Sequence, residues 1–259
     1  MTPKRIVVAG LLASLSVGTW ATADPIRVIL VGDSTLAPHN GYGDALCARF
    51  TPQVTCLNLA RNGRSSGSYR AEGLWQNVLD LLADQGADKG MYKATYVLVE
   101  FGHNDQPGKP GRSTDLKTEF PANLSRYIDE IRAAGGTPVL VTPLTRRSFK
   151  GRQLANDLQP WADADQAVAA ARQAPLIDLF TASAAAVQAM GSAEADTLAV
   201  EPPPSVQAAP ADRNQLEAVT NKKSAFDHTH VGPKGADFFA TLMVQLLRNG
   251  LPALAPYFR

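Results

Sequence analysis

Short apolar segments alternate with longer segments of helical periodicity along most of this chain. The apolar segments predict buried parallel strands at residues 27–31, 54–59, 94–101, 137–142 and 175–178. The amphipathic segments predict helices at residues 42–50, 69–83, 121–134, 157–173, 182–190 and 233–248. This alternation is typical of a parallel sheet that is covered by helices on both faces.

We therefore predict an α/β fold with three layers, α/β/α, around a parallel sheet of five strands. The length of 259 residues is enough for one such domain with a substantial core. In sheets of this kind, ligands bind beyond the carboxyl ends of the strands. Polar residues that directly follow a predicted strand are therefore the first candidates for chemistry.

The first 23 residues have the pattern of a secretory signal peptide. Lys4 and Arg5 precede an apolar stretch that ends in the A-x-A cleavage site Ala21-Thr22-Ala23. The stretch is short for a membrane span, so we expect cleavage after Ala23 and a mature domain over residues 24–259. The mature protein would be secreted or periplasmic, and an uncleaved N-terminal anchor is the alternative.

Composition adds little about partners and leaves two features open. The formal net charge of +1 gives no indication of nucleic acid, and we expect a monomer with no membrane association after cleavage. Cys47 and Cys56 either form a disulfide, which export permits, or are two small buried residues. Residues 192–223 are rich in Ala, Pro and charge and predict a surface insertion, either a flap or a disordered loop.

Two segments together supply a serine nucleophile and its acid–base partners. Gly32-Asp33-Ser34-Thr35 directly follows the first strand, where backbone N–H groups can stabilise an oxyanion. Asp227 and His230 lie three residues apart before the last helix. A serine hydroxyl needs such a base with an orienting carboxylate, so we predict catalytic roles for Ser34, His230 and Asp227. Taken singly, a helix-capping serine and a structural histidine explain the two segments equally well.

Two further segments supply candidate oxyanion donors. Asn104 follows the third strand, and its amide could donate to a developing oxyanion. Gly63 follows the second strand, and without a Cβ its N–H could approach a substrate closely. Each alone is an ordinary turn, but the four segments together complete an acyl-transfer site. A zinc site would need three protein ligands, and no H-E-x-x-H or cysteine-based set is present, so we expect no metal.

These segments, at residues 31–35, 60–75, 99–105 and 227–230, resemble in order the motif blocks of the SGNH (GDSL-type) hydrolase family. Within that family they are most similar to rhamnogalacturonan acetylesterases, although Thr35 stands where Leu is commoner. The resemblance implies a flavodoxin-like five-stranded sheet and no metal or organic cofactor. It also implies an acyl-enzyme on Ser34 and an oxyanion hole formed by the Ser34 N–H, the Gly63 N–H and the Asn104 side chain. Residues 192–223 depart from the family's usual spacing, which leaves substrate size and access open.

Ser65 is a competing nucleophile. Gly63-Arg64-Ser65-Ser66-Gly67 matches G-x-S-x-G, the nucleophile elbow of α/β-hydrolases. An elbow joins strand and helix tightly, whereas residues 60–62 intervene here after the strand. We therefore prefer Ser34.

The resemblance also indicates a substrate, acetyl esters on rhamnogalacturonan, a pectic polymer that carries uronic acids. A polyanion favours cationic groups near the site. Eight cationic residues fall on or near loops at the expected edge: Arg64, Arg70, Lys109, Arg112, Arg146, Arg147, Lys150 and Arg152. Arg64 and Arg146 lie closest to strand ends, so we predict that these two contact substrate, with ordinary solvated charge as the alternative. Trp75 and Trp161 lie in helical patterns and are predicted to pack in the core.

Two other functions compete with a carbohydrate acetylesterase. A lysophospholipase or thioesterase on a related scaffold would need a long apolar groove, whereas the candidate loops are polar. A non-catalytic polysaccharide-binding protein would not need the complete set of Ser34, Gly63, Asn104, Asp227 and His230. Acetate release compared with fatty-acid release separates the three.

Overall fold

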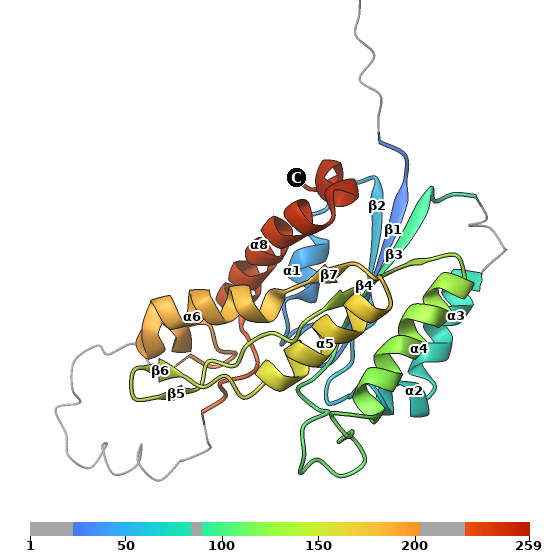
Figure 1. Ribbon diagram of the computed structural model, residues 1–259. Helices are drawn as coiled ribbons and strands as arrows, with labels where there is room; N and C mark the ends of the chain where they lie inside the picture. Colours follow the sequence, from blue (N-terminus) through green and yellow to red (C-terminus); the bar gives the residue numbers. More distant parts are fainter. Residues whose placement is uncertain (1–22, 84–89, 203–225) are drawn as a thin grey trace, which may run out of the picture.

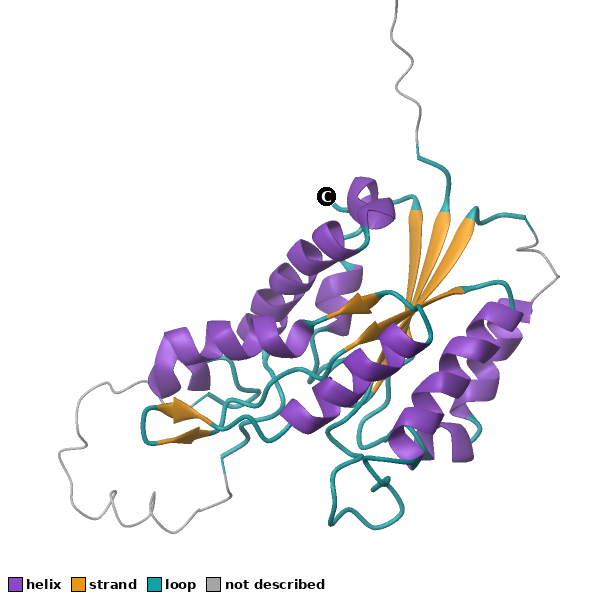
Figure 2. Ribbon diagram, viewed as in Figure 1, coloured by secondary structure: helices purple, strands orange, loops and turns teal. Residues whose placement is uncertain are grey.

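The computed structural model describes residues 23–83, 90–202 and 226–259 as a parallel sheet between two layers of helices (Figures 1 and 2). The sheet has the strand order β2-β1-β3-β4-β7, and all of its pairings are parallel. Its strands are β1 (Ile26–Gly32), β2 (Val54–Asn58), β3 (Ala94–Glu100), β4 (Thr137–Val141) and β7 (Leu176–Ile177). The predicted fold class is confirmed.

Alternating side chains of the strands pack against both layers of helices. On one face, Val28 and Leu30 of β1 share a buried cluster with Phe239 of α8. On the other face, Ile29 and Val31 share a second cluster with side chains of α3, α4 and α5. The first face is covered by α1 (Gly43–Cys47), α6 (Leu179–Asp196) and α8 (Pro233–Gly250). The second is covered by α2 (Ser68–Ala71), α3 (Leu74–Ala83), α4 (Glu119–Ala133) and α5 (Gln159–Ala171). Because both faces are buried, the strands read as continuous apolar runs.

The helix predicted at residues 69–83 is divided into α2 and α3. Gly73 lies between them with φ at +78°, a left-handed conformation that ends α2 and that glycine adopts without a Cβ clash. Gly191, with φ at +73°, interrupts α6 in the same way. The pattern of apolar residues is continuous across Gly73, so periodicity alone did not reveal the break.

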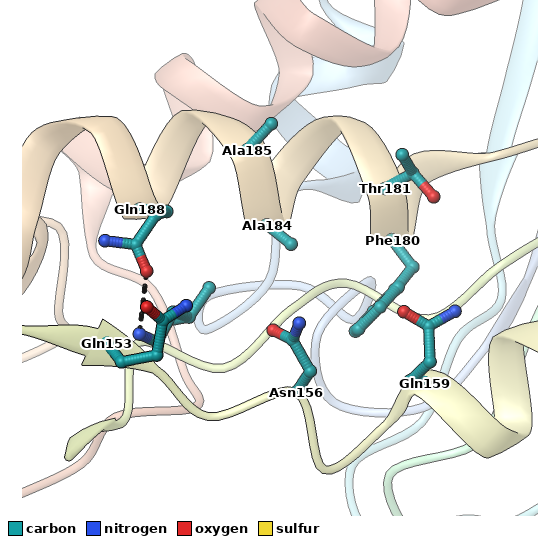
Figure 3. Close-up of a pocket in the computed structure, with 9 residues that line it drawn as sticks. Gln153, Asn156, Gln159, Phe180, Thr181, Ala184, Ala185 and Gln188 are labelled. Carbon is teal, nitrogen blue, oxygen red and sulfur yellow. Dashed lines mark hydrogen bonds between the residues drawn. The ribbon is translucent and has the colours of Figure 1, made fainter.

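A two-stranded hairpin and a short 3₁₀ helix add to the predicted elements. The hairpin consists of β5 (Phe149–Lys150) and β6 (Gln153–Leu154), and the 3₁₀ helix η1 is Pro252–Tyr257. Gln188 of α6 holds the hairpin, because its side chain accepts the Leu154 N–H at 2.8 Å (Figure 3). The same side chain donates to the Arg152 carbonyl at 3.0 Å.

Cys47 and Cys56 form a disulfide that joins α1 to β2, with Cα atoms 5.4 Å apart. This pairing decides between the two interpretations that the sequence leaves open. In the segment predicted as an insertion, residues 192–196 complete α6, Leu198 and Ala199 are buried, and residues 203–225 lie outside the described structure. The predicted signal peptide also lies outside it, apart from its last residue. None of the helices within the described ranges has the length and apolar character to cross a membrane.

Candidate active site

Three side chains from opposite ends of the chain meet at the carboxyl edge of the sheet. Ser34 lies in the turn after β1, and Asp227 and His230 lie on the loop that leads into α8. His230 Nε2 is 2.8 Å from Ser34 Oγ, and His230 Nδ1 is 2.8 Å from Asp227 Oδ2. Both distances are within hydrogen-bond range. The imidazole can therefore take the hydroxyl proton while the carboxylate orients the ring.

Local backbone geometry holds the carboxylate of Asp227 in this orientation. Its second oxygen, Oδ1, accepts the N–H groups of Thr229 and His230 at 2.8 and 2.9 Å. Partial burial acts to raise the pKa of Asp227, but these bonds and the nearby imidazole hold that pKa below its usual value. Asp227 is therefore ionised at neutral pH, and its Oδ2 atom faces the histidine.

Arg147 fixes the backbone of the same loop. It is only 1% exposed, and its guanidinium donates to the carbonyl oxygens of Asp227 and His230 at 2.7 and 2.9 Å. Its own N–H donates to the carbonyl of His228 at 2.8 Å. Arg147 lies at the active edge as predicted, but it is buried and its guanidinium satisfies carbonyl groups of the protein, so it is not a cation that substrate can reach.

The candidate oxyanion donors lie on neighbouring loops. Gly63 has φ at +75°, and the Asn104 amide donates one hydrogen to the Arg64 carbonyl at 3.1 Å, which leaves its second hydrogen available. Neither Ser34 nor Gly63 donates its N–H to a carbonyl oxygen of the described residues. Three donors are therefore free to bind a developing negative charge.

Asp105 joins the loop of Gly63 to the loop of Asn104. This buried carboxylate accepts the Ser66 N–H at 3.1 Å, the Ser66 hydroxyl at 2.6 Å and the Thr114 hydroxyl at 2.9 Å. Burial raises the pKa of Asp105 to about 6, although the bonds from Ser66 and Thr114 act to lower it. Sequence reasoning did not single out this contact, because its partners are distant in the chain.

A buried network of acids and hydroxyls supports the turn that carries Ser34. Asp33 is fully buried and accepts both the N–H and the hydroxyl of Thr35 at 2.9 Å. The carboxyl oxygens of Glu100, at the end of β3, lie 2.9 Å from the Thr35 hydroxyl and 2.5 Å from the Tyr42 hydroxyl. Burial, together with the charge of Asp33, raises the pKa of Glu100 to about 8.

The competing nucleophile Ser65 has no base beside it in the described structure. Its hydroxyl is buried and bonds to the hydroxyl and the N–H of Ser68 at 3.1 Å, at the start of α2. These contacts are local and structural, within the turn that leads into α2. The geometry favours Ser34, whose hydroxyl is the one that faces an imidazole.

The two arginines predicted to contact substrate both lie beside the site, and both are paired. Arg64 forms an ion pair with Glu72 at 2.7 Å. Arg146 forms an ion pair with Asp157, and its Nε lies 3.3 Å from the Thr229 hydroxyl. Their charges are therefore partly neutralised within the protein.

Other residues named from the sequence are engaged within the protein. Arg70 pairs with Glu130 at 2.7 Å and lies over the ring of Trp75, so its charge is neutralised by a neighbouring side chain. Trp75 and Trp161 are each 3% exposed, which confirms that they pack in the core. A separate hollow between α6 and the hairpin is bordered by amide side chains (Figure 3), but none of its lining residues is titratable. This hollow therefore offers no acid or base of its own.

Comparison with known proteins finds relatives in both sequence and fold. The model of the GDSL-like lipase/acylhydrolase family matches residues 14–237. A rhamnogalacturonan acetylesterase of Bacillus subtilis (strain 168) is 31% identical over 237 residues, which cover 88% of this chain and 92% of the relative. A rhamnogalacturonan acetylesterase of Emericella nidulans is 40% identical over 133 residues, which cover 51% and 48%. The crystal structure of an acetylxylan esterase from Geobacillus stearothermophilus is similar in fold, with a TM-score of 0.57 at 14% identity over 85% of this chain and 93% of that one.

Proposed function

This chain belongs to the GDSL-like lipase/acylhydrolase family, and we propose that it is a serine esterase that removes acetyl groups from a polysaccharide, specifically rhamnogalacturonan. The observation that carries the proposal is the continuous contact from Asp227 through His230 to Ser34, at 2.8 Å in each step. The Bacillus subtilis relative, a rhamnogalacturonan acetylesterase that aligns with 88% of this chain, supports the choice of substrate.

The proposed reaction has two steps. In the first, His230 takes the Ser34 proton as Oγ attacks the acetyl carbonyl carbon, and the oxyanion accepts hydrogen bonds from Ser34, Gly63 and Asn104. The carbon–oxygen bond to the sugar then breaks, and the sugar oxygen leaves with the proton from His230. In the second step, water gives a proton to His230 and attacks the acyl-enzyme. Acetate leaves, and the proton returns to Ser34.

A panel of esters tests this function. Wild-type protein should release acetate from acetylated rhamnogalacturonan, acetylated xylan and 4-nitrophenyl acetate, with the highest kcat/KM on the first, and no fatty acid from a lysophospholipid. Ser34→Ala should lower kcat by at least about a thousandfold. Ser65→Ala is the matched control, since it also removes a buried hydroxyl near this edge, and it should retain kcat.

The opposite pattern would reject the assignment. Loss of activity in Ser65→Ala with activity retained in Ser34→Ala would move the nucleophile to the G-x-S-x-G segment. Fatty-acid release without acetate release would indicate a lipid esterase, and binding of polysaccharide with no release at all would indicate a non-catalytic protein.

Export is part of the same proposal, because polymeric pectin is found outside the cell that would degrade it. The sequence pattern at residues 1–23 supports it. Expression of the full chain should yield a mature protein in the periplasm or the medium. N-terminal sequencing should then begin at Asp24, and retention of Met1 in the exported protein would contradict cleavage.

A further inference from the structure

A hollow of about 590 Å³ is lined by Asn62 and Arg64, the residues on either side of Gly63, and its volume is within the roughly 300–1,000 Å³ typical of small-molecule sites. One wall comes from residues 37–39, after the Ser34 turn, and the other from residues 60–62, after β2. Backbone hydrogen bonds hold both walls next to Ser34, because Ala37 N–H donates to the Asp33 carbonyl at 3.0 Å and Arg61 N–H to the Gly32 carbonyl at 2.9 Å. Any group in this hollow is therefore close to the reacting ester.

The lining of the hollow carries positive charge and no acidic side chain. Arg61 and Arg64 supply this charge, and His39 also lines the hollow. Arg64 is neutralised by Glu72 at 2.7 Å. Arg61 is exposed, and it forms no ion pair with any acidic residue within the described ranges. Its guanidinium, with five donors in a planar fork, matches the geometry of a carboxylate.

The wall opposite Arg61 is built in a conformation that is unfavourable for its residue. His39 has φ at +74°, and it is one of two residues other than glycine with positive φ in the described structure. Such a conformation is uncommon for a residue with a Cβ, and it is often kept at ligand-binding sites. The hollow thus combines an unpaired cation, an exposed imidazole and a strained wall next to the nucleophile.

We propose that this hollow is a subsite for the carboxylate of a uronic acid unit in the same polymer chain as the acetylated sugar, with Arg61 as its main ligand. The subsite rests on the proposed function, because it assumes that the substrate is an acetylated polymer that contains uronic acids. The hollow in Figure 3 offers amides but no cation, so it could not distinguish a uronate from a neutral sugar. Recognition of the anion by Arg61 would make the enzyme selective for pectic polymers over xylan.

Binding can be measured without turnover, in a Ser34→Ala background. Calorimetric titration with unacetylated trigalacturonate should show binding, and adding Arg61→Gln should weaken it about tenfold, the effect expected for loss of one charge-assisted contact. Arg172→Gln is the matched control. This arginine also lies on the surface, at the end of α5 and the opposite edge of the sheet, and it pairs with Asp129. Its replacement should leave trigalacturonate affinity unchanged.

Kinetics in the otherwise wild-type protein give a second readout. Arg61→Gln should raise KM for acetylated rhamnogalacturonan about tenfold and leave kcat/KM for 4-nitrophenyl acetate unchanged. Equal trigalacturonate affinity with and without Arg61, or no binding by the Ser34→Ala protein, would overturn the subsite. A third outcome separates the two proposals. If trigalacturonate binding depends on Arg61 but the wild-type protein releases no acetate, the proposed esterase function is rejected and the anion site is retained.

Discussion

Glu100 supports the nucleophile turn through a hydrogen bond to Thr35, the residue after Ser34. It is 1% exposed, and burial raises its pKa to about 8. In the unfolded chain its pKa is near 4.5. Between these values the folded state holds the proton and the unfolded state does not. The stability that Glu100 contributes is therefore complete below about pH 4.5, falls as the pH rises towards 8, and is lost above it.

Replacing Glu100 by Gln should remove this dependence on pH. The quantity to compare is the free energy of unfolding of Glu100→Gln minus that of wild type. This difference should be larger at pH 8.5 than at pH 5, by up to about 1.4 kcal/mol for each pH unit between the two pKa values. Urea denaturation of both proteins at the two pH values measures the change. Asp105 also has a raised pKa but is present in both proteins, so its contribution cancels. The same difference at both pH values would show that Glu100 does not change its protonation between the folded and unfolded states.

Arg147 is the link between two elements that are distant in the chain, the segment after β4 and the loop before α8. The two shortest contacts of its guanidinium are to carbonyl oxygens of Asp227 and His230, at 2.7 and 2.9 Å. Nη2 donates to both of these carbonyls, and Nη1 donates to that of Thr229 at 3.4 Å. A lysine ammonium is a single nitrogen, so it cannot hold all three carbonyls in the manner of a guanidinium. Arg147 is therefore a positioning residue for the acid and the base, with no contact to Ser34 itself.

Arg147→Lys should lower kcat on 4-nitrophenyl acetate by about ten- to a hundredfold, since small displacements of an acid–base pair are costly, while KM changes little. Arg132→Lys provides a control of matched chemistry, because the Arg132 guanidinium also donates to two carbonyls, those of Arg172 and Gln173, at 2.9 Å. It should keep wild-type kcat. Circular dichroism checks that both variants fold. Full kcat in a folded Arg147→Lys protein would show that the loop keeps its geometry without the guanidinium.

At the scale of the whole molecule, the sequence predicted the sheet and the position of the site, because both follow from local order. Apolar runs mark the strands, and residues that follow parallel strands meet at one edge. Ser34, Gly63 and Asn104 could therefore be placed together before any contact was known. The supporting contacts could not be predicted, because Arg147 meets its partners 80 and 83 residues away and no periodicity encodes such a pairing.

The distribution of charge over the folded molecule could not be predicted from the sequence either. The formal net charge is +1, yet several cations gather at the active edge. Partial burial, together with the nearby charges of Arg146 and Arg112, holds the pKa of Lys109 below the usual value. The sequence could list these residues but could not show which of them are paired, buried or free. A nearly neutral protein with a cationic edge should attract a polyanion locally and little else.

Ionic strength tests this charge distribution as a whole. Raising the salt concentration from 20 to 300 mM shortens the Debye length from roughly 20 Å to roughly 6 Å, so attraction of a polyuronate to the edge should weaken. We expect kcat/KM on acetylated rhamnogalacturonan to fall several-fold over this range, mainly through KM, while kcat/KM on 4-nitrophenyl acetate stays nearly constant. The neutral ester is the control for salt effects on the acid–base groups. Parallel responses of the two substrates would mean that the cations at this edge are ordinary surface charge with no part in capturing the polymer.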